Sequence, residues 1–423
     1  MNNIDGFIRL KNQFRHYDWG SYDFIPDFLG FENSQNLPWA EMWMGSHPGA
    51  PSMVEKDGTL ISLGNLIAEN TEYCLGKRGA EKYGQLPFLF KLLAAGKPLS
   101  IQAHPPEGKA SEGFHRENRE GLPLDAPNRN YRDTRHKPEI ICALNSFAAL
   151  CGFRKKEEIY SLIEIISKIS DGELKQSMEK LMSALKQEAE NPLRTFIKTF
   201  ITEFSGSHEL GQLLIKRQAL LERDFPEYKG EWKICSYLAS LYPADGSVIA
   251  PLFLNILELK PGEAMYIPTG ILHAYIYGFG IELMADSDNV IRGGLTAKHI
   301  DREELLKILD FSEYQPEIIK APDSSPGPFH SSYPARYEEF TLSVMKSQGD
   351  RVFYSETGPS IVMVSEGNAA VASGNDTLLE MKTGESIFIP AGKDLFFSGT
   401  FNAFAAAANV TIAVNTADAC RSL

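Results

Sequence analysis

The chain of 423 residues contains no apolar run that approaches the roughly 20 residues needed to span a bilayer. Its N-terminus mixes Asn, Asp, Gly and Arg with isolated apolar residues, so it lacks the basic start and the continuous apolar stretch of a signal peptide. These two absences predict a cytoplasmic protein that does not enter a membrane.

Cysteine is scarce, with five residues and no Cys-x-x-Cys pair. An odd, scattered set argues against a disulfide framework and against a metal held by cysteines. We therefore expect reduced, structural thiols at Cys74, Cys142, Cys151, Cys235 and Cys420.

Basic residues are outnumbered, since 42 Lys and Arg face 55 Asp and Glu and leave a net charge of -13. A chain of this charge is not generally attracted to nucleic acid or to anionic membranes. A small anionic substrate can still bind, but only where a local cluster of Lys and Arg reverses the sign of the charge.

The length predicts two or three domains, because a chain of this size is too long for one hydrophobic core. Residues 157–221 have little Gly, and their apolar residues recur at helical spacing, with a turn at 167–172 and a break at Pro192. Short β-rich runs on both flanks, such as 247–259 and 360–371, predict antiparallel sheet. The proline-rich stretch 313–331 is typical of a linker.

Two segments on either side of that linker resemble each other, 261–268 and 383–390. Each has Gly-Glu, an alternating strand and then Pro, with five residues between the Gly and the Pro. Beyond the Pro the first copy reaches His273, whereas the second copy has Leu395 at the matching position. The spacing resembles the second motif of the cupin superfamily, whose jelly-roll barrel holds a metal. One barrel is expected to bind metal and the other to have lost that ability.

Partners for His273 are expected on earlier strands. Residues two apart on a strand face the same side, so Gln102 and His104 can point together into a barrel. Glu139 opens an apolar run that is typical of another strand. Two imidazoles and two oxygens, one of them anionic, suit Zn²⁺ better than iron, manganese or cobalt. A lone His or Glu is more often structural, and it is the ordered set of four that favours a metal site.

Six ordered segments resemble the type I phosphomannose isomerases, from near the start of the chain onward. They are 17–20, 40–48, 87–93, 99–105, 136–139 and 287–296. The resemblance implies that Gln102, His104, Glu139 and His273 bind one zinc ion and that Arg292 is catalytic. It also implies interconversion of mannose 6-phosphate and fructose 6-phosphate by a monomer.

The same resemblance implies a mainly β fold with a helical insertion: two cupin-type jelly-roll barrels plus an α-helical domain. The expected parts are a catalytic barrel (1–25, 88–153 and 242–310), a helical insertion (154–241) and a second, metal-free cupin-like domain (26–87 and 311–423).

An aldose-ketose isomerase must open the sugar ring, remove a proton from C2 and deliver one to C1 through an enediol or enediolate. Arg292, which is always charged, is expected to stabilise the enediolate. Lys137 can add positive charge, or titrate if it is desolvated. Glu282 is the candidate for the base or for the group that orients the base, although a buried partner for a cation is an equal alternative.

The phosphate dianion needs convergent donors and at least one cation. Arg292, Lys298 and Lys91 are the candidate cations, and the Ser100 hydroxyl is a further donor. For each lysine a solvated or structural role is an open alternative. The segment 298–301 departs from the family pattern.

Two other functions fit part of this pattern. A cupin dioxygenase would hold iron with His104, Glu139 and His273 and leave positions open for oxygen. A non-catalytic sugar-binding cupin would bind its ligand without turnover.

Overall fold

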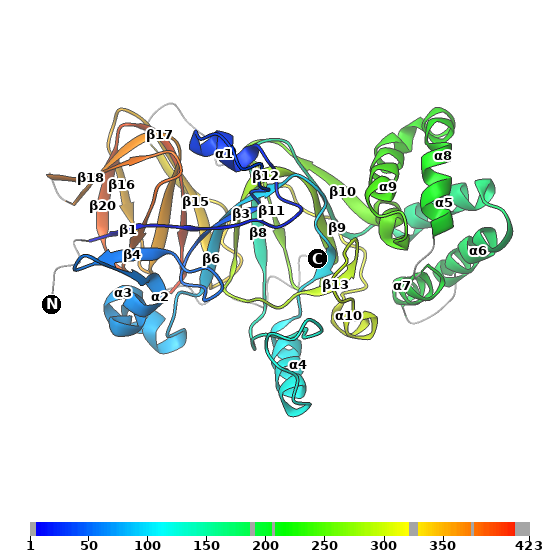
Figure 1. Cartoon of the computed structure of the whole chain (residues 1–423), viewed down its shortest axis with the longest axis horizontal. Helices are drawn as coiled ribbons and strands as arrows, with labels where there is room; N and C mark the ends of the chain where they lie inside the picture. The colour runs from blue at the N-terminus through cyan, green and yellow to red at the C-terminus, as the bar shows by residue number, and fades with distance from the viewer. Residues whose placement is uncertain (1–5, 187–190, 205–207, 321–328, 374–375, 411–423) are drawn as a thin grey trace.

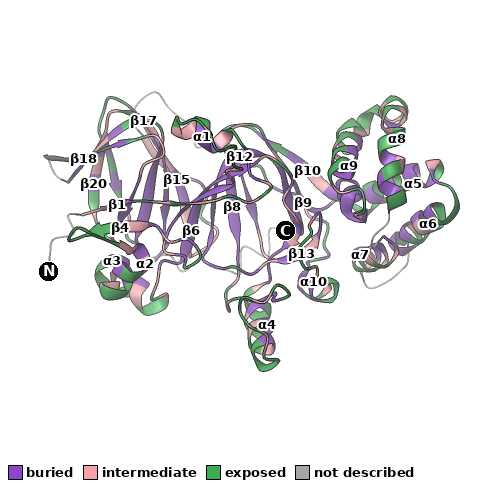
Figure 2. Cartoon of the chain, in the orientation of Figure 1, coloured by how far each residue is buried: buried purple, intermediate pink, exposed green. Residues whose placement is uncertain are grey.

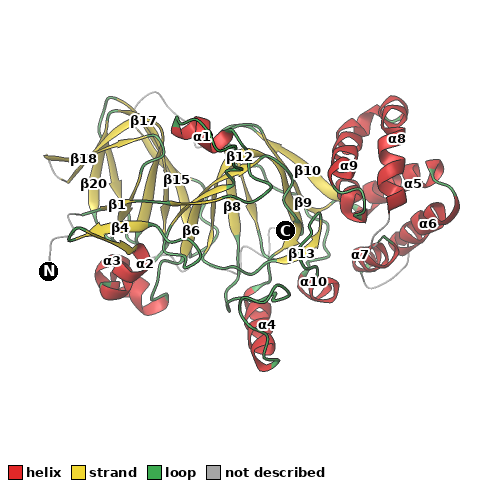
Figure 3. Cartoon of the chain, in the orientation of Figure 1, coloured by secondary structure: helices red, strands yellow, loops and turns green. Residues whose placement is uncertain are grey.

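Two antiparallel sheets and a group of helices lie in a row along the long axis of the molecule (Figures 1 and 3). This computed structural model describes residues 6–186, 191–204, 208–320, 329–373 and 376–410. A ten-stranded sheet occupies the middle of the row, with a nine-stranded sheet on one side and the helices α5 to α9 on the other.

The ten-stranded sheet is built mainly from the first and third quarters of the chain. Its main path is β10 (Leu254–Leu259), β9 (Phe147–Phe153), β12 (His273–Ala285), β6 (Phe88–Ala95), β3 (Glu41–Met44) and β2 (Gln13–Arg15). Off this path lie β11 (Ala264–Ile267), β8 (Glu139–Ala143), β7 (Ile101–Ala103) and β13 (Ile291–Gly294). All eight residues of β6 are buried, which suits a near-continuous apolar run covered on both faces.

The nine-stranded sheet is formed mainly by the C-terminal part of the chain. Its path is β1 (Ile8–Leu10), β19 (Ser386–Ile389), β17 (Ser360–Ser373), β21 (Thr400–Ala407), β15 (Thr341–Gln348) and β14 (Phe329–Ser332). Off this path lie β16 (Val352–Ser355), β18 (Asp376–Lys382) and β20 (Asp394–Ser398). A separate ribbon joins β4 (Met53–Lys56) to β5 (Thr59–Ser62).

The helices are distributed around and beyond the sheets. They are α1 (Phe24–Leu29), α2 (Leu63–Glu69), α3 (Thr71–Lys82), α4 (Glu107–Arg119), α5 (Lys156–Ile169), α6 (Gly172–Lys186), α7 (Pro192–Glu203), α8 (His208–Asp224), α9 (Lys229–Leu241) and α10 (Arg302–Ile308). The helical content expected for 157–221 is confirmed, as is its turn between α5 and α6. Pro192 begins α7 behind the N-cap Asn191, where its missing N–H costs nothing.

The repeated sequence forms the same turn twice. Gly262 and Gly384 have φ values of 84° and 85°, a left-handed conformation that favours glycine. The backbone N–H of Gly262 donates to Ala143 O, and that of Gly384 donates to Val364 O, each at 2.8 Å. Each turn leads into a short buried strand, β11 or β19. The sequence repeat is therefore also a structural repeat.

Burial follows this division into parts (Figure 2). One apolar cluster joins the two sheets and includes Phe90, Leu283, Phe340 and Phe388. A second cluster lies within the nine-stranded sheet, and a third packs the helices against β9 and β10. The sheets thus share a continuous core.

Two details differ from the sequence analysis. The run 247–259 was expected to be strand, but its first part is a 3-10 helix, η2 (Gly246–Leu252), followed by β10. Pro251 explains this, because it lacks the N–H that a strand interior needs. Strand pairing also crosses the expected boundaries: β1 joins the nine-stranded sheet, and β3 joins the ten-stranded one.

The predicted linker lies partly outside the described residues, at 321–328.

Four of the five cysteines lie in the described part of the chain, and all four are buried and unpaired. The fifth, Cys420, lies outside it. None of the described helices is both long and apolar enough to cross a membrane.

Candidate active site

Three potential metal ligands meet inside the ten-stranded sheet. His273 is the first residue of β12, Glu139 is the first residue of β8, and His104 directly follows β7. The Nε2 atom of His104 lies 3.2 Å from Glu139 Oε1, and that of His273 lies 3.6 Å from Glu139 Oε2. All three residues are at most 1% exposed. The ligand-type atoms of the trio lie within 4.8 Å of one another.

The hydrogen bonds of the two imidazoles fix their tautomers. His104 Nδ1 lies 2.7 Å from the carbonyl oxygen of Asn289, and His273 Nδ1 lies 2.9 Å from that of Ile271. A carbonyl oxygen only accepts, so each Nδ1 carries the hydrogen and each neutral Nε2 presents a lone pair. Both Nε2 atoms and Glu139 Oε2 are buried without a hydrogen-bond partner. Each of these atoms presents a lone pair, and buried lone pairs without a hydrogen-bond partner are suited to coordinate a metal ion.

The protonation states also suit a cation. Burial lowers the pKa of His104, and burial together with the neighbouring His104 lowers the pKa of His273 to about 4. Burial alone would raise the pKa of Glu139, but Lys137 and the two histidines hold it well below the usual value. Two neutral imidazoles and one carboxylate therefore face the same point at neutral pH.

Gln102 is aligned with this trio through strand register. On β7 it lies directly opposite His273 of β12 and Arg292 of β13. Opposite residues of antiparallel strands share a face, so Gln102, His273 and Arg292 lie on one side of the sheet. The Ser100 hydroxyl donates to Gln102 Oε1 at 3.3 Å. Ser100 is therefore adjacent to a candidate ligand.

A buried ion cluster lies on the neighbouring strands. Lys91 Nζ on β6 donates to Glu282 of β12 at 2.9 Å and to Glu41 of β3 at 3.3 Å. The indole of Trp43 also donates to Glu41, at 2.8 Å. Burial alone would lower the pKa of Lys91, but the two carboxylates outweigh it and raise the pKa. Burial raises the pKa of Glu282 against the opposing effect of Lys91.

Lys137 connects the cluster to the metal ligands, because its Nζ lies 3.0 Å from Glu139 Oε1. The buried set contains three carboxyl groups, on Glu41, Glu139 and Glu282, and two ammonium groups, on Lys91 and Lys137. Three negative charges against two positive ones leave one uncompensated negative charge. A divalent cation beside Glu139 would change the net charge of this set from -1 to +1, so the buried carboxylates would no longer outnumber the positive charges.

Three cations lie near one another: Arg292 on β13, Lys298 in the loop after it, and Arg132 in the segment before β8. Arg292 is partly buried, and burial together with the neighbouring Arg132 lowers its pKa. Burial, Arg292 and Arg132 together lower the pKa of Lys298. The Lys298 ammonium also lies 5.6 Å from the ring centroid of Tyr17. Positive charges placed near one another favour the binding of an anion.

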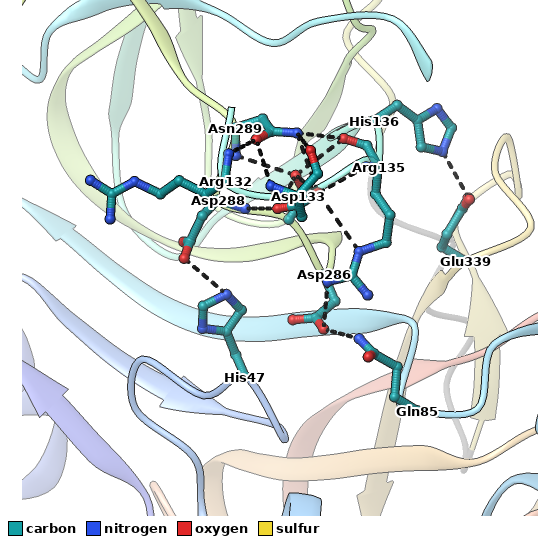
Figure 4. A network of polar contacts seen from close by, with 11 residues as sticks. His47, Gln85, Arg132, Asp133, Arg135, His136, Asp286, Asp288, Asn289 and Glu339 are labelled. Atoms are coloured by element: carbon teal, nitrogen blue, oxygen red, sulfur yellow. Dashed lines mark hydrogen bonds and ion pairs between the residues drawn. The ribbon is translucent and has the colours of Figure 1, made fainter. Parts of the chain in front are cut away.

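A polar network holds the chain between α4 and β8 against the end of β12 (Figure 4). The Asn289 side chain, which is 0% exposed, accepts from the backbone N–H groups of Arg132 and Asp133. It also donates to the carbonyl oxygens of Asp133 and Arg135, each at 2.9 Å. In Figure 4 the Arg132 guanidinium points away from this network. Asn289 therefore ties the segment before Glu139 to the carbonyl that orients His104.

The nine-stranded sheet has a counterpart of the metal site that lacks the ligands. Ser360 pairs with Ile389 as Glu139 pairs with Ile267, and Tyr354 pairs with Leu395 as Gln102 pairs with His273. Gly392 donates to the carbonyl oxygen of Glu356 as Gly270 donates to that of His104. The four matching residues are thus Tyr354, Glu356, Ser360 and Leu395. Among the described residues no group of three His, Cys, Asp or Glu gathers there.

The structure brings together His104, Glu139 and His273 as the sequence predicts, and it sets Lys137 against Glu139. Lys91 and Glu282 form one ion pair, which matches the structural alternative considered for both. Sequence reasoning missed Glu41, Trp43, Arg132 and Asn289. The first two lie in the segment 40–48, but only the pairing of β3 with β6 reveals their partner Lys91.

Comparisons with known proteins agree with this site. Residues 7–156 match the family model "Phosphomannose isomerase type I, catalytic domain". Mannose-6-phosphate isomerase of Escherichia coli is 34% identical over 91% of this chain and 95% of its own length. Mannose-6-phosphate isomerase 2 of Arabidopsis thaliana is 32% identical over 92% of this chain and 90% of its own length.

Solved structures give the same result. The crystal structure of mannose 6-phosphate isomerase from Salmonella typhimurium, bound to fructose 6-phosphate and zinc, has a TM-score of 0.83. It is 32% identical, and the match covers 95% of this chain and 99% of that one. With a site of matching chemistry and relatives aligned over nearly their whole length, this chain belongs to the type I phosphomannose isomerase family.

Proposed function

We propose that this protein is a zinc-dependent mannose-6-phosphate isomerase that interconverts D-mannose 6-phosphate and D-fructose 6-phosphate. The observation that carries the proposal is the buried trio His104, Glu139 and His273, whose Nε2 atoms and one carboxylate oxygen have no partner. The zinc and fructose 6-phosphate bound by the Salmonella relative supply the matching ion and substrate.

We assign the single zinc ion to Gln102, His104, Glu139 and His273. Two neutral imidazoles, one carboxylate and one amide oxygen form a donor set that Zn²⁺ accepts. When bound, zinc supplies a Lewis acid that holds and polarises the sugar oxygens. The hydrogen bonds from Nδ1 of each histidine leave its Nε2 lone pair available, so His104 and His273 would hold the ion through Nε2.

The proton transfer belongs to a buried group beside these ligands. In the forward direction a base removes the proton from C2 of the open-chain aldose, and the C1 oxygen gains negative charge in the enediolate. The C2 hydroxyl proton then moves to the C1 oxygen and the base returns a proton to C1, which leaves a ketone at C2. Two groups are candidates. Lys137 Nζ lies 3.0 Å from Glu139 Oε1, and burial raises the pKa of Glu282, which favours its protonated form. Arg292 keeps its own proton and stabilises the enediolate charge.

The substrate phosphate is assigned to the cations at the end of β13. Arg292 and Lys298, together with Arg132, provide three positive charges near one another. Such a local reversal of sign is what a chain with a net charge of -13 needs to bind a dianion. Ser100 remains a candidate donor. Lys91 is a weaker candidate, because two carboxylates already neutralise its ammonium.

The layout proposed for the molecule is two cupin-type jelly-roll barrels, one in each large sheet, with 154–241 as a helical insertion. The repeated turn and the matching strand pairs support this layout. Pairing of β1 and β3 moves the boundary between the parts within residues 1–87. A monomer in the cytoplasm stays the expectation.

An oxygen-using cupin would employ the same trio with iron. The whole-length similarity to isomerases favours the isomerase. Turnover of mannose 6-phosphate at an unchanged rate under argon would exclude the oxygenase. An oxygen requirement would favour it.

Isomerisation in D₂O tests the proposed proton transfer. The protein converts mannose 6-phosphate in D₂O, and NMR of the fructose 6-phosphate measures deuterium at C1. A base that exchanges with solvent introduces deuterium there, whereas a direct hydride shift introduces none. Full turnover without any deuterium at C1 would contradict a base that exchanges its proton with solvent during turnover and leave the substrate assignment intact.

A further inference from the structure

The loop after Arg292 starts with an unfavourable backbone conformation. Leu295 has a φ of 53°, in the left-handed region that a branched residue rarely adopts. This conformation costs on the order of 1 kcal/mol or more and persists only where surrounding contacts enforce it. Leu295 lies between Arg292 and Lys298, the two cations assigned to the substrate phosphate. The strain therefore occurs at the base of the loop that places Lys298.

Asp245 provides the contacts that enforce it. Its Oδ2 accepts a hydrogen bond from the Leu295 backbone N–H at 2.6 Å, and its Oδ1 accepts from the Ser247 N–H at 2.8 Å. Hydrogen bonds from an N–H to a charged carboxylate are roughly twice as strong as neutral ones. The two oxygens thus join the start of η2 to the loop.

Ser247 and Gly294 complete this clamp. The Ser247 hydroxyl donates to the carbonyl oxygen of Gly293 at 3.3 Å. A Cβ atom at Gly294 would lie 2.0 Å from that hydroxyl oxygen, so the close approach requires glycine. Two side chains, one from the N-cap of η2 and one from its second residue, therefore hold three successive residues, Gly293 to Leu295.

We propose that Asp245 is a positioning residue that sets the Arg292–Lys298 loop for the substrate phosphate and links the end of the helical segment to the active site. This proposal rests on the isomerase function. Asp245 touches neither the reacting atoms nor the candidate metal ligands. It acts through the backbone of Leu295, so its loss moves Lys298 and leaves the metal trio in place.

The test compares Asp245→Ala and the near-isosteric Asp245→Asn with the unaltered protein. We expect Asp245→Ala to raise KM for mannose 6-phosphate and the inhibition constant of inorganic phosphate by about tenfold, with a smaller change in kcat. Zinc content stays at one per chain. Asp245→Asn falls between the two, because an amide oxygen can serve one N–H while its NH₂ group opposes the other.

Asn191→Ala is the matched control. Asn191 also caps a helix of the helical segment, because its Oδ1 accepts a hydrogen bond from the Arg194 N–H at 2.9 Å. It does not belong to the Arg292–Lys298 loop. Its loss should lower stability by about 1 kcal/mol and leave KM and phosphate inhibition unchanged.

The outcomes separate the two hypotheses. Calorimetric titration with inorganic phosphate needs no turnover, so it reports on the loop even if the isomerase assignment is wrong. If the parent protein is active and Asp245→Ala binds inorganic phosphate as tightly as the parent does, the positioning role of Asp245 is wrong. A zinc-loaded parent without isomerase activity would overturn the function instead. If Asp245→Ala does not fold, Asp245→Asn decides the question by the same measurements.

Discussion

At the scale of single residues, the candidate site is defined by buried charges that lack ordinary compensation. Two imidazole nitrogens and one carboxylate oxygen face one another without partners, and the surrounding carboxyl groups outnumber the ammonium groups. In an apo protein such an arrangement is costly, because unpaired buried polar atoms lose their hydration. A bound cation resolves the imbalance, so metal binding and stability are expected to be linked.

Replacing a ligand and replacing the arginine should have different effects. His273→Ala removes one imidazole, so zinc content and turnover should fall together. Arg292→Ala removes positive charge from the phosphate and the enediolate, so turnover should drop by a factor of about a hundred or more while zinc stays bound. Metal analysis and steady-state rates measure both effects. Near-normal turnover in Arg292→Ala would show that Arg292 is not catalytic.

Asp286 allows a test of stability against pH. Its side chain is 2% exposed, and burial raises its pKa from 3.8 to about 6 despite His47 and Arg135. Asp133 and Asp288 also disfavour its charge. The native carboxyl holds its proton up to about pH 6, whereas the unfolded one releases it near 3.8. The native state therefore binds more protons in this window, and the free energy of unfolding falls as pH rises through it.

The variant Asp286→Asn lacks this titration, and its amide oxygen can still accept the hydrogen bond from Gln85. Its stability relative to the parent should increase from about pH 4 to about pH 6.5, by up to about 3 kcal/mol, since each pKa unit corresponds to about 1.4 kcal/mol. Urea unfolding at a series of pH values measures the difference. A difference that does not vary with pH would contradict the assignment.

The sequence predicted the clustered residues correctly where the residue type and a local strand motif were sufficient to identify them. His104, Glu139 and His273 each stand at the edge of a recognisable strand. Glu41 was missed because its contact with Lys91 depends on how β3 pairs with β6. Asp245 was missed because its role depends on a loop 50 residues away in the sequence. Long-range register and loop closure are set by tertiary packing, which a local pattern does not contain.

At the scale of elements, one supersecondary unit occurs twice with different contents. The turn and the strand that follows it make equivalent hydrogen bonds and strand pairs in both copies, from Gly262 to β11 and from Gly384 to β19. The first copy ends at His273 and the second at Leu395, which is 0% exposed in an apolar cluster. The repeat was visible in the sequence because the turn requires glycine. The 3-10 helix η2 was not, because its apolar residues also suit a strand.

Leu395→Ala tests the difference between the copies. The substitution leaves a cavity in the core of the nine-stranded sheet, so the free energy of unfolding should fall by about 2–5 kcal/mol. Zinc content and turnover of the folded protein should stay unchanged. Denaturant unfolding, metal analysis and rate measurements at a temperature where the variant is folded give the three values. Loss of zinc in this variant would indicate that the metal binds in the nine-stranded sheet, which would contradict the assignment to the ten-stranded sheet.

At the scale of the whole molecule, the three parts have separate tasks. The ten-stranded sheet holds the charged cluster and the candidate metal ligands. The nine-stranded sheet extends the shared core, and its described residues form no group of three potential metal ligands. The helical segment lies on the side of the ten-stranded sheet opposite the nine-stranded one. Asp245, just after this segment, contacts the Arg292–Lys298 loop by accepting a hydrogen bond from the Leu295 N–H. For a chain with a net charge of -13, we propose that the anionic substrate binds where Arg292, Lys298 and Arg132 lie near one another.

Chelation followed by reconstitution tests the central claim most directly. The rate of fructose 6-phosphate formation from mannose 6-phosphate is measured on the untreated protein, after removal of metal, and after addition of Zn²⁺. The account predicts that activity disappears with the metal and returns with one zinc per chain. Folded, fully zinc-loaded protein that forms no fructose 6-phosphate would contradict it.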